Sequence, residues 1–425
     1  MRVLPRVLEA ITPSREEREI ELAFCEMLVA HIRDNAPQSC MVVLTGSMAK
    51  GTFLRDKRDI DVFVLFDRSV PKEELEPSIK NIMDSAFPSL GYQLSYAEHP
   101  YVRFHFEGRR IDLVPAYRIT EASERISAVD RSVLHTEFVR KSLTESQAGS
   151  VLLLKQFLRA GGIYGAEIKT AGFSGYLCEL LIIHYGSFEK LLKAASKWKK
   201  GAFIDLKKHY KSPKAAKEAA KRFGIFAVID PTDRNRNVAA AVSPASLKAF
   251  IALAKAFLKK PAEGAFFRKP ESFEDKLRKS RRRTLIVSMP RPDIVDDILW
   301  GQLYKMLNQL EKHLAEFGPG RILADDSRHL VRLAIPLSRD RLPPEVLVAG
   351  PPLKMKANLE KFRKSHRRAK FVKKGGRLWA VTKRAETRPE QYVAGFFRAY
   401  AKTRSHLAYP PEMIVVERLD RKKFR

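Results

Sequence analysis

Cysteine is scarce in this chain, whose 425 residues include only Cys25, Cys40 and Cys178. The three are far apart in the sequence, and no two form a CxxC pair. This spacing argues against a disulfide framework and against a cysteine-based zinc site, because both need cysteines at short, recurring intervals. We therefore expect interior thiols in a reducing compartment.

Long hydrophobic runs are also missing. The most apolar stretch, 176–185, is interrupted by Glu179 and is shorter than the roughly 20 residues that a transmembrane helix needs. The N-terminal segment MRVLPRVLEAITPSREERE becomes charged too early for a secretory signal. These absences predict a soluble, cytoplasmic protein with no membrane partner.

Acidic residues are outnumbered by basic ones. The chain has 79 Lys and Arg against 49 Asp and Glu, a net charge of +30, while its 45% apolar content is normal for folded domains. The surplus is concentrated in 193–222, 276–283 and 354–374. A folded chain with this surplus is expected to bind a polyanion, nucleic acid before membrane. For the run at 193–222, a solvated helix face is the alternative.

Apolar spacing predicts mixed α and β structure in the first 120 residues. A helix is expected over 14–34, where Ser14 and Glu17 fit a capping box. The apolar face of this helix is expected to carry Ile20, Phe24, Leu28 and Ile32. Strands are expected at 41–45, at 58–66 and in a hairpin over 101–117 that turns near Glu107-Gly108.

The rest of the chain divides at a charged, proline-containing stretch, 266–283. Before it, from about 130, the pattern is helical, and one helix over 151–162 ends in glycines. After it, strands are expected at 283–290, 328–337 and 413–419, and helices at 296–318 and 388–402. The predicted fold class is therefore α+β and multidomain.

The most informative segment is GSMAKGTFLRDKRDIDVFV, residues 46–64. Gly46 and Ser47 lie between a strand and an expected helix start, where free backbone N–H groups favour an anion such as phosphate. Asp59 and Asp61 are two residues apart on a strand, so their side chains point to the same face. A third acid, Asp112, interrupts the apolar strand RIDLVPAY.

Neighbouring carboxylates repel one another, and a divalent cation relieves that repulsion. Carboxylate oxygens suit Mg²⁺, and three acids can hold two metal ions for phosphoryl transfer. An isolated DxD is more often a surface pattern. The Gly-Ser turn upstream and the third acid downstream favour a metal site here.

These motifs are similar to those of a known superfamily. GS, KGT and DID, followed by a distant strand Asp, resemble the nucleotidyltransferases that include DNA polymerase β and poly(A) polymerases. Within that superfamily, several segments of this sequence resemble the archaeal, class I CCA-adding enzymes. They are EHPYVRFHFEGRRIDLVPAY, VLLLKQFLRAGGIYG, GFSGYLCELLIIHYG and VIDPTDRNRNVAAAV. The resemblance covers residues 1–245 by motif and the remainder by layout and length.

The resemblance implies an enzyme that builds or repairs the 3′-terminal CCA of tRNA from CTP and ATP, with two Mg²⁺ ions and release of pyrophosphate. It also implies a homodimer and a seahorse-shaped architecture with a polymerase β-like head. The expected domains are a head at 1–137, a helical neck at 138–268, an α+β body at 269–320 plus 396–425, and a tRNA-binding tail at 321–395. Two alternatives are a poly(A) polymerase-like enzyme and a non-catalytic RNA-binding protein on the same scaffold.

The resemblance also implies roles for single residues. Asp59, Asp61 and Asp112 would be the catalytic, metal-binding acids, although some relatives have Glu at the first position. The nucleotide would be bound by Gly46, Ser47, Lys50, His135, Lys155, Tyr164, Arg236 and Asp230. The tRNA would be bound by His99, Arg103, Lys364, Arg367 and Arg368.

Some of these roles have alternatives. Arg236 would contact the base with Asp230 as its support, but Arg234 is close enough to take that place. Lys50 is alternatively a solvated helix charge, and a lone histidine such as His135 is otherwise usually a capping or core residue.

Overall fold

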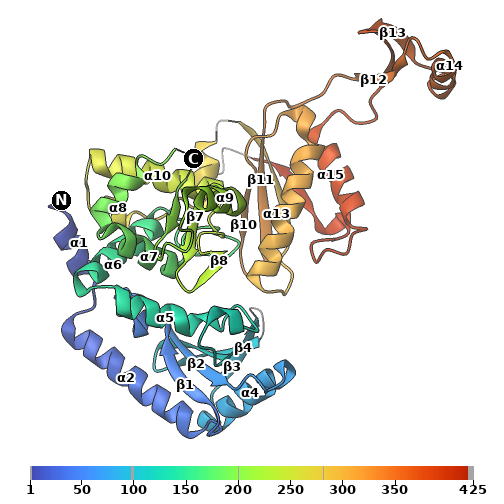
Figure 1. Cartoon of the computed structure of the whole chain (residues 1–425). Coiled ribbons are helices and arrows are strands. Elements are labelled where there is room, and N and C mark those ends of the chain that lie inside the picture. Colours follow the sequence, from blue (N-terminus) through green and yellow to red (C-terminus); the bar gives the residue numbers. More distant parts are fainter. Residues whose placement is uncertain (1, 97–99, 200, 281, 420–425) are drawn as a thin grey trace. The chain divides into compact units, whose positions relative to one another are not determined.

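The computed structural model describes residues 2–96, 100–199, 201–280 and 282–419. The chain divides into two compact units, one that ends at Pro270 and one that begins at Glu271 (Figure 1). This division lies two residues beyond the end of the expected neck. In the described ranges, no helix is long and apolar enough to cross a bilayer.

The first unit begins with a five-stranded sheet in the order β1-β2-β5-β4-β3. Its strands are β1 (Met41–Thr45), β2 (Ile60–Phe66), β3 (Tyr92–Tyr96), β4 (Pro100–Phe106) and β5 (Arg109–Tyr117). β2 and β5 run parallel, whereas the other pairs are antiparallel. The helices α2 (Arg15–Asp34) and α4 (Leu75–Ala86) cover one face, where Val62 and Val64 join the core (Figure 1).

The odd-numbered residues of β2 point to the other face of this sheet, because side chains alternate along a strand. There Phe63 and Leu65 pack with Val114 and with Val133 of α5 (Arg131–Ser142). The alternation therefore places Asp61 and Asp112 on the face that is covered by α5 rather than in the α2–α4 core.

The predicted helix at 14–34 and its capping box are confirmed, with hydrogen bonds in both directions between Ser14 and Glu17. Ile20 was wrongly assigned to the buried face, because 53% of it is exposed. Glu21 takes the inward position at that turn and binds Arg58 and Arg109. Two charge-assisted contacts thus replace the expected apolar one.

The hairpin is also confirmed, and its turn explains its position. Glu107 and Gly108 have φ angles of 47° and 72°. Two consecutive residues with positive φ form the type of turn whose twist matches paired strands. β4 and β5 consequently pair from Phe106↔Arg109 onward.

The rest of the first unit consists mainly of helices. These are α1 (Leu4–Ile11), α6 (Glu145–Ala160), α7 (Gly175–Tyr185), α8 (Phe188–Ala195), α9 (Pro213–Phe223), α10 (Pro244–Lys259) and α11 (Gly264–Phe267). Four phenylalanine rings form the centre of their core, at positions 157, 188, 257 and 266.

This region also contains a sheet that was not predicted, formed by β6 (Phe203–Asp205), β7 (Ala227–Asp230) and β8 (Asp233–Asn237). Its strands are only three to five residues long. Segments this short show too few alternations to be distinguished from loops in a sequence.

The second unit contains two sheets. The first has the order β10-β11-β9-β15, from Leu323–Asp326, Leu330–Leu337, Arg283–Pro290 and Val415–Arg418. It packs against α13 (Asp296–His313) and α15 (Pro389–Tyr400). The second sheet has the order β12-β14-β13, from Glu345–Pro352, Arg377–Lys383 and Lys370–Lys374, with α14 (Lys356–Ser365) beside it.

The structure divides this unit differently from the expected body and tail. β10 and β11 fall within the expected tail at 321–395, but β11 pairs with β9 along eight residues. Because this pairing is continuous, β11 belongs to the body sheet. The sheet of β12, β14 and β13, with α14, is the part of the expected tail that is separate from the body sheet. The predicted helix at 296–318 ends at His313, and a short 3₁₀ turn leads to Gly318 with a φ of 62°.

Short elements complete the chain. They are α3 (Gly46–Ala49), α12 (Phe273–Lys279) and the 3₁₀ turns Lys72–Glu74, Ala122–Glu124, Ala315–Phe317 and Pro411–Met413.

Candidate active site

Three acids meet at one end of the parallel strand pair. Asp61 on β2 lies directly opposite Asp112 on β5, and Asp59 immediately precedes β2. The parallel register thus brings together carboxylates about fifty residues apart in sequence, as the two separate motifs predicted.

These carboxylates differ in their electrostatic surroundings. Burial raises the pKa of Asp61 to about 6, and the negative charges of Asp112 and Asp59 act in the same direction, against the opposing effect of Lys50. Asp59 is paired with Arg110 at 2.7 Å. Asp61 is therefore the acid with the least compensated charge.

Arg103, which is expected to contact tRNA, binds Asp112 in this structure. Its Nε and Nη2 donate to the two carboxylate oxygens at 2.7 and 2.8 Å. This bidentate contact raises the pKa of Arg103. Contact of Arg103 with tRNA stays a prediction.

Gly46 lies directly over Asp61. Its φ of +68° is left-handed, and a Cβ atom added there would be 1.9 Å from Oδ2 of Asp61. Only glycine permits this approach. Ser47 follows in α3, which has only four residues, and is partly buried.

The donor set fits a hard divalent cation, because all three groups offer carboxylate oxygens. Among the described residues, no group of three His, Cys, Asp or Glu side chains is arranged to hold a metal ion. Asp59 and Asp112 instead each face an arginine. A bound cation would take over the neutralising charge that these arginines supply.

A second group of charges is buried beside the acids. Lys50 donates to Oε2 of Glu179 at 2.7 Å, and Lys155 donates to Oε1 at 3.3 Å. The exposed fractions of these three side chains are 8% for Lys50, 3% for Lys155 and 0% for Glu179. Burial opposes ionisation of Glu179, but the two lysines outweigh it and lower its pKa.

Thr52 completes this group. Its hydroxyl donates to Oε1 of Glu179 at 2.7 Å, and its carbonyl and hydroxyl oxygens accept from Lys155 at 2.9 and 3.1 Å. Lys50 is therefore not the solvated helix charge of the alternative. Binding of the nucleotide by Lys50 and Lys155 stays a prediction.

A third group surrounds Asp230, which is fully buried. Its Oδ2 accepts from Arg236 at 2.9 Å and lies 2.8 Å from Nε2 of His135. The hydroxyl of Tyr176 donates to Oδ1 at 3.2 Å. Burial lowers the pKa of His135 despite the neighbouring carboxylate. His135 is thus a mostly buried histidine that is paired with Asp230, its binding of the nucleotide stays a prediction, and the predicted neighbours Arg236 and Asp230 are in contact.

Tyr176 connects the last two groups. Its ring stacks on His135 with centroids 4.1 Å apart, and Nζ of Lys50 lies 5.9 Å from its centroid. Tyr164 is close to the lysine group as well, since a Cβ atom on Gly175 would lie 3.3 Å from its hydroxyl and 3.6 Å from Nζ of Lys155.

Arg234 is exposed, and its guanidinium lies 5.7 Å from the ring centroid of Tyr210. His99 lies outside the described residues. The three basic residues expected to bind tRNA in the second unit are exposed, at positions 364, 367 and 368.

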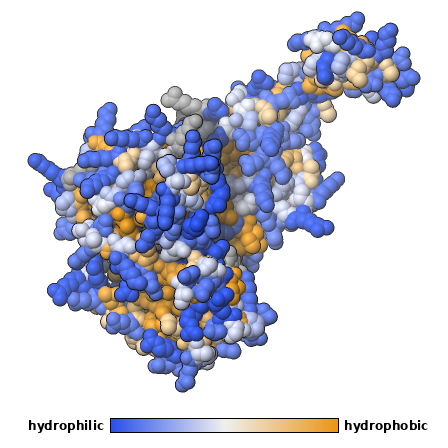
Figure 2. All heavy atoms as spheres, viewed as in Figure 1, coloured by the Kyte–Doolittle hydropathy of each residue, from blue (hydrophilic) through white to orange (hydrophobic). Residues whose placement is uncertain are grey.

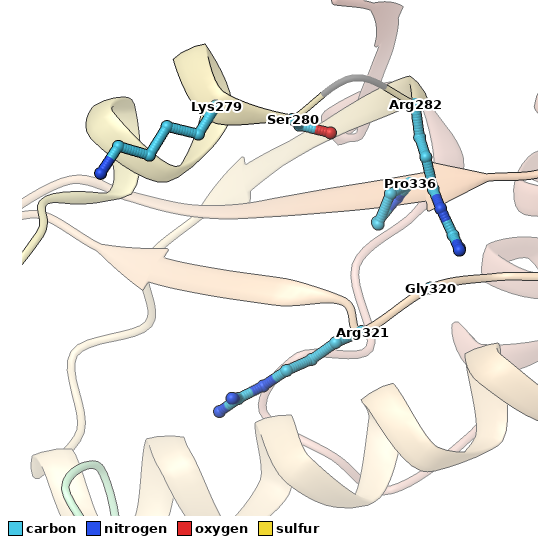
Figure 3. A pocket seen from close by; sticks show the side chains of 6 residues that line it. All are labelled: Lys279, Ser280, Arg282, Gly320, Arg321 and Pro336. Atoms are coloured by element: carbon cyan, nitrogen blue, oxygen red, sulfur yellow. The ribbon is translucent and has the colours of Figure 1, made fainter. Parts of the chain in front are cut away.

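The second unit also has a basic pocket of about 450 Å³. Lys279, Arg282 and Arg321 line it and point in different directions (Figure 3). Arg282 lies so close to Gly320 that a Cβ atom there would be 2.8 Å from its Nη1. Lys279 is paired with Glu271.

Glu179, Tyr176 and Thr52 were missed as site residues. The signal for Glu179 was visible, because it interrupts the most apolar stretch of the chain. An acid in such a position requires a buried partner. Its partners are Lys50 and Lys155, which are 129 and 24 residues away in the sequence. Contacts at such separations cannot be predicted from the spacing of residues.

We predict that Asp112→Asn lowers the pKa of Asp61 below its wild-type value of about 6. The substitution removes a negative charge that disfavours ionisation of Asp61. Carboxyl ¹³C NMR titration without metal, with Asp61→Asn to identify the signal, measures the midpoint. Asp67→Asn, at an exposed acid, is the control. An unchanged or higher midpoint in Asp112→Asn would contradict the electrostatic coupling.

Matches to known family models cover most of the chain. Residues 25–135 match the nucleotidyltransferase domain, 149–267 match the second domain of tRNA nucleotidyltransferases, and 281–404 match the C-terminal domain of CCA-adding enzymes. The last match extends the family likeness beyond the motifs of the first 245 residues.

Curated proteins named CCA-adding enzyme are similar over most of their length. The Methanosarcina acetivorans enzyme is 38% identical, covering 86% of this chain and 82% of its own. The Methanocaldococcus jannaschii enzyme is 38% identical, covering 90% and 87%. The Pyrobaculum aerophilum enzyme is 36% identical, covering 91% and 90%.

A solved structure of Cid1, described with RNA terminal uridylyl transferase activity, has a TM-score of 0.50 at 13% identity. It covers 64% of this chain and 97% of its own. At this identity the likeness concerns the fold, and it agrees with the predicted α+β nucleotidyltransferase class. The family matches and the curated relatives together show that this chain belongs to the CCA-adding enzymes, a family of tRNA nucleotidyltransferases.

Proposed function

We propose that this enzyme completes and repairs the 3′ end of tRNA by adding C, C and A from CTP and ATP without a nucleic acid template. The observation that carries the proposal is the juxtaposition of Asp61 and Asp112 beneath Gly46, with Asp59 at the start of the same strand. Membership of the family supplies the substrate class.

The chemistry is an in-line nucleotidyl transfer. The 3′-hydroxyl oxygen of tRNA forms a bond to the α-phosphorus, the bond to the β-phosphate oxygen breaks, and pyrophosphate leaves. Two Mg²⁺ ions, when bound, would lower the pKa of the hydroxyl and neutralise charge on the triphosphate. Asp59 and Asp61 would hold them, and Asp112 would bind metal and orient the hydroxyl.

The two buried groups suit the two ends of the nucleotide. Ser47, Lys50 and Tyr164 would face the triphosphate, and His135 the ribose. Lys155 is also expected to bind the triphosphate, and it would exchange one of its two contacts with Thr52 for a phosphate oxygen. Arg236 uses Nη1 to bind Asp230 and is 32% exposed. Among the described residues its other N–H groups make no hydrogen bond, so they can reach the edge of cytosine or adenine. This supports Arg236 over Arg234 as the base-contacting residue.

The surface of the second unit suits an RNA backbone. α14 has no buried residue, and Figure 2 shows predominantly hydrophilic residues around it. In the described part of the chain, Lys364, Arg367 and Arg368 make no ion pair, unlike Lys279 in the basic pocket. Exposed cations of this kind can contact the phosphates of an RNA backbone. The homodimer and the cytoplasmic location stay predictions.

We expect the purified enzyme to add three nucleotides to tRNA that lacks its CCA end and then stop. Labelled CTP and ATP, supplied singly and together, give the product length on a gel. Asp61→Ala should abolish incorporation while tRNA binding stays near wild type, because it removes a metal ligand and not an RNA contact. A long adenylate tail would indicate the poly(A) polymerase alternative, and no product from wild type would support the non-catalytic one.

We expect Gly46→Ala to lower the rate of nucleotide addition by at least about 100-fold. The new methyl group would overlap with Oδ2 of Asp61, which displaces either the loop or the carboxylate. Gly108→Ala is the matched control, because Gly108 has a φ of +72° and open space around its Cβ position. Single-turnover assays compare the two variants, and equal rates would refute the close packing over Asp61.

Replacing Lys364, Arg367 and Arg368 together with Ala should weaken tRNA binding and reduce its salt dependence. Each lost phosphate contact removes about 0.7–0.9 from the slope of log K against log salt. The control replaces Lys72, Lys305 and Lys312, which are exposed outside the basic runs. Filter binding at several salt concentrations measures the slope, and an unchanged slope argues against an RNA contact at α14.

A further inference from the structure

Glu179 takes no direct part in the chemistry proposed above, yet it is fully buried between two lysines. A purely structural ion pair needs one lysine for one glutamate. Two buried ammonium groups beside one carboxylate leave one positive charge that Glu179 does not neutralise. Lys50 also acts on the charge of Asp61, so one of the two lysines serves the acidic site as well as the local packing.

The hydrogen bonds distinguish the two lysines. An ammonium group has three N–H donors. Lys155 has three acceptors within bonding distance, two on Thr52 and one on Glu179, so its donors are all used. In the described part of the chain, Lys50 has one acceptor, Oε2 of Glu179. Lys50 is therefore the lysine with donors left for a ligand.

The position of Lys50 suits an anion at the acidic site. Residue 50 ends the short helix that begins at Gly46, which lies over Asp61. Its ammonium group is also near the ring of Tyr176, which stacks on His135. Lys50 thus lies between the acids and the Asp230 group, where a nucleotide would extend from its phosphates to its base.

We propose that Glu179 is a positioning residue for the incoming nucleotide. Lys155 and Thr52 fix its carboxylate, and the carboxylate holds the ammonium group of Lys50 where the triphosphate of CTP or ATP binds. This inference rests on the proposed function, since the triphosphate is the ligand that Lys50 would meet.

The test is Glu179→Gln, which keeps the shape and removes the charge. The amide oxygen can still accept from Thr52 and Lys155, which leaves the amide NH₂ facing Lys50. We expect KM for CTP and ATP to rise about tenfold, kcat to change less than about threefold, and KM for tRNA to stay at the wild-type value.

Glu21→Gln is the matched control. Glu21 is a glutamate that is 1% exposed between two cations, Arg58 and Arg109, in the same unit. It should lower the melting temperature and leave KM for the nucleotides unchanged. If Glu179→Gln behaves like this control, with a lower melting temperature and a wild-type KM, Glu179 is only structural and the inference is overturned.

A double mutant tests whether Glu179 affects nucleotide binding through Lys50. If Glu179 acts through Lys50, the pair Lys50→Met/Glu179→Gln should have the same nucleotide KM as Lys50→Met alone, within about twofold. If the increases in nucleotide KM of the two single variants multiply in the double variant, the inference is overturned. Should Glu179→Gln alone fail to fold, the double variant, which loses one charge of each sign, is still compared with Lys50→Met. A nucleotide KM that differs from that of Lys50→Met by more than about twofold then overturns the inference. Wild-type CCA addition in the same assay tests the proposed function separately.

Discussion

Two ammonium groups and one carboxylate are buried together where the loop after α3 meets α6 and α7, and the first unit depends on this contact. Lys50 and Glu179 are 129 residues apart in sequence, and Lys155 and Thr52 are 103 apart. Removing one partner from a buried ion pair costs about 3–5 kcal/mol, because it leaves a charge without compensation. The loop and the two helices are therefore stable in this form only when they are packed against one another.

The first turns of α7 extend this constraint to the rest of the site. Tyr176 and Glu179 are three residues apart and lie on the same side of the helix. One contacts His135 and Asp230, and the other contacts both lysines. The groups assigned to the base and to the phosphates thus share one rigid element. Displacement of α7 would move both together, so the distance between them is preserved.

Local patterns could be predicted from the sequence, and contacts between distant segments could not. The capping box at Ser14 and the turn at Glu107 each depend on a few adjacent residues. The meeting of Asp61 and Asp112 was predictable because an acid in an apolar strand needs an explanation. Ile20 was misplaced because periodicity does not reveal that two arginines draw Glu21 inward. The small sheet of β6–β8 and the partners of Glu179 depend on chain folding over long separations.

The parallel pairing of β2 and β5 also has a consequence for how the protein folds. The two strands are about fifty residues apart in the sequence, and contacts at such separation form slowly. A slip of one residue would turn Asp112 toward the apolar face, opposite Ile60 or Val62. A carboxylate there would be buried without a partner, so the misaligned sheet would be unstable and would open again. The acids that equip the sheet for chemistry thereby also select its correct alignment during folding.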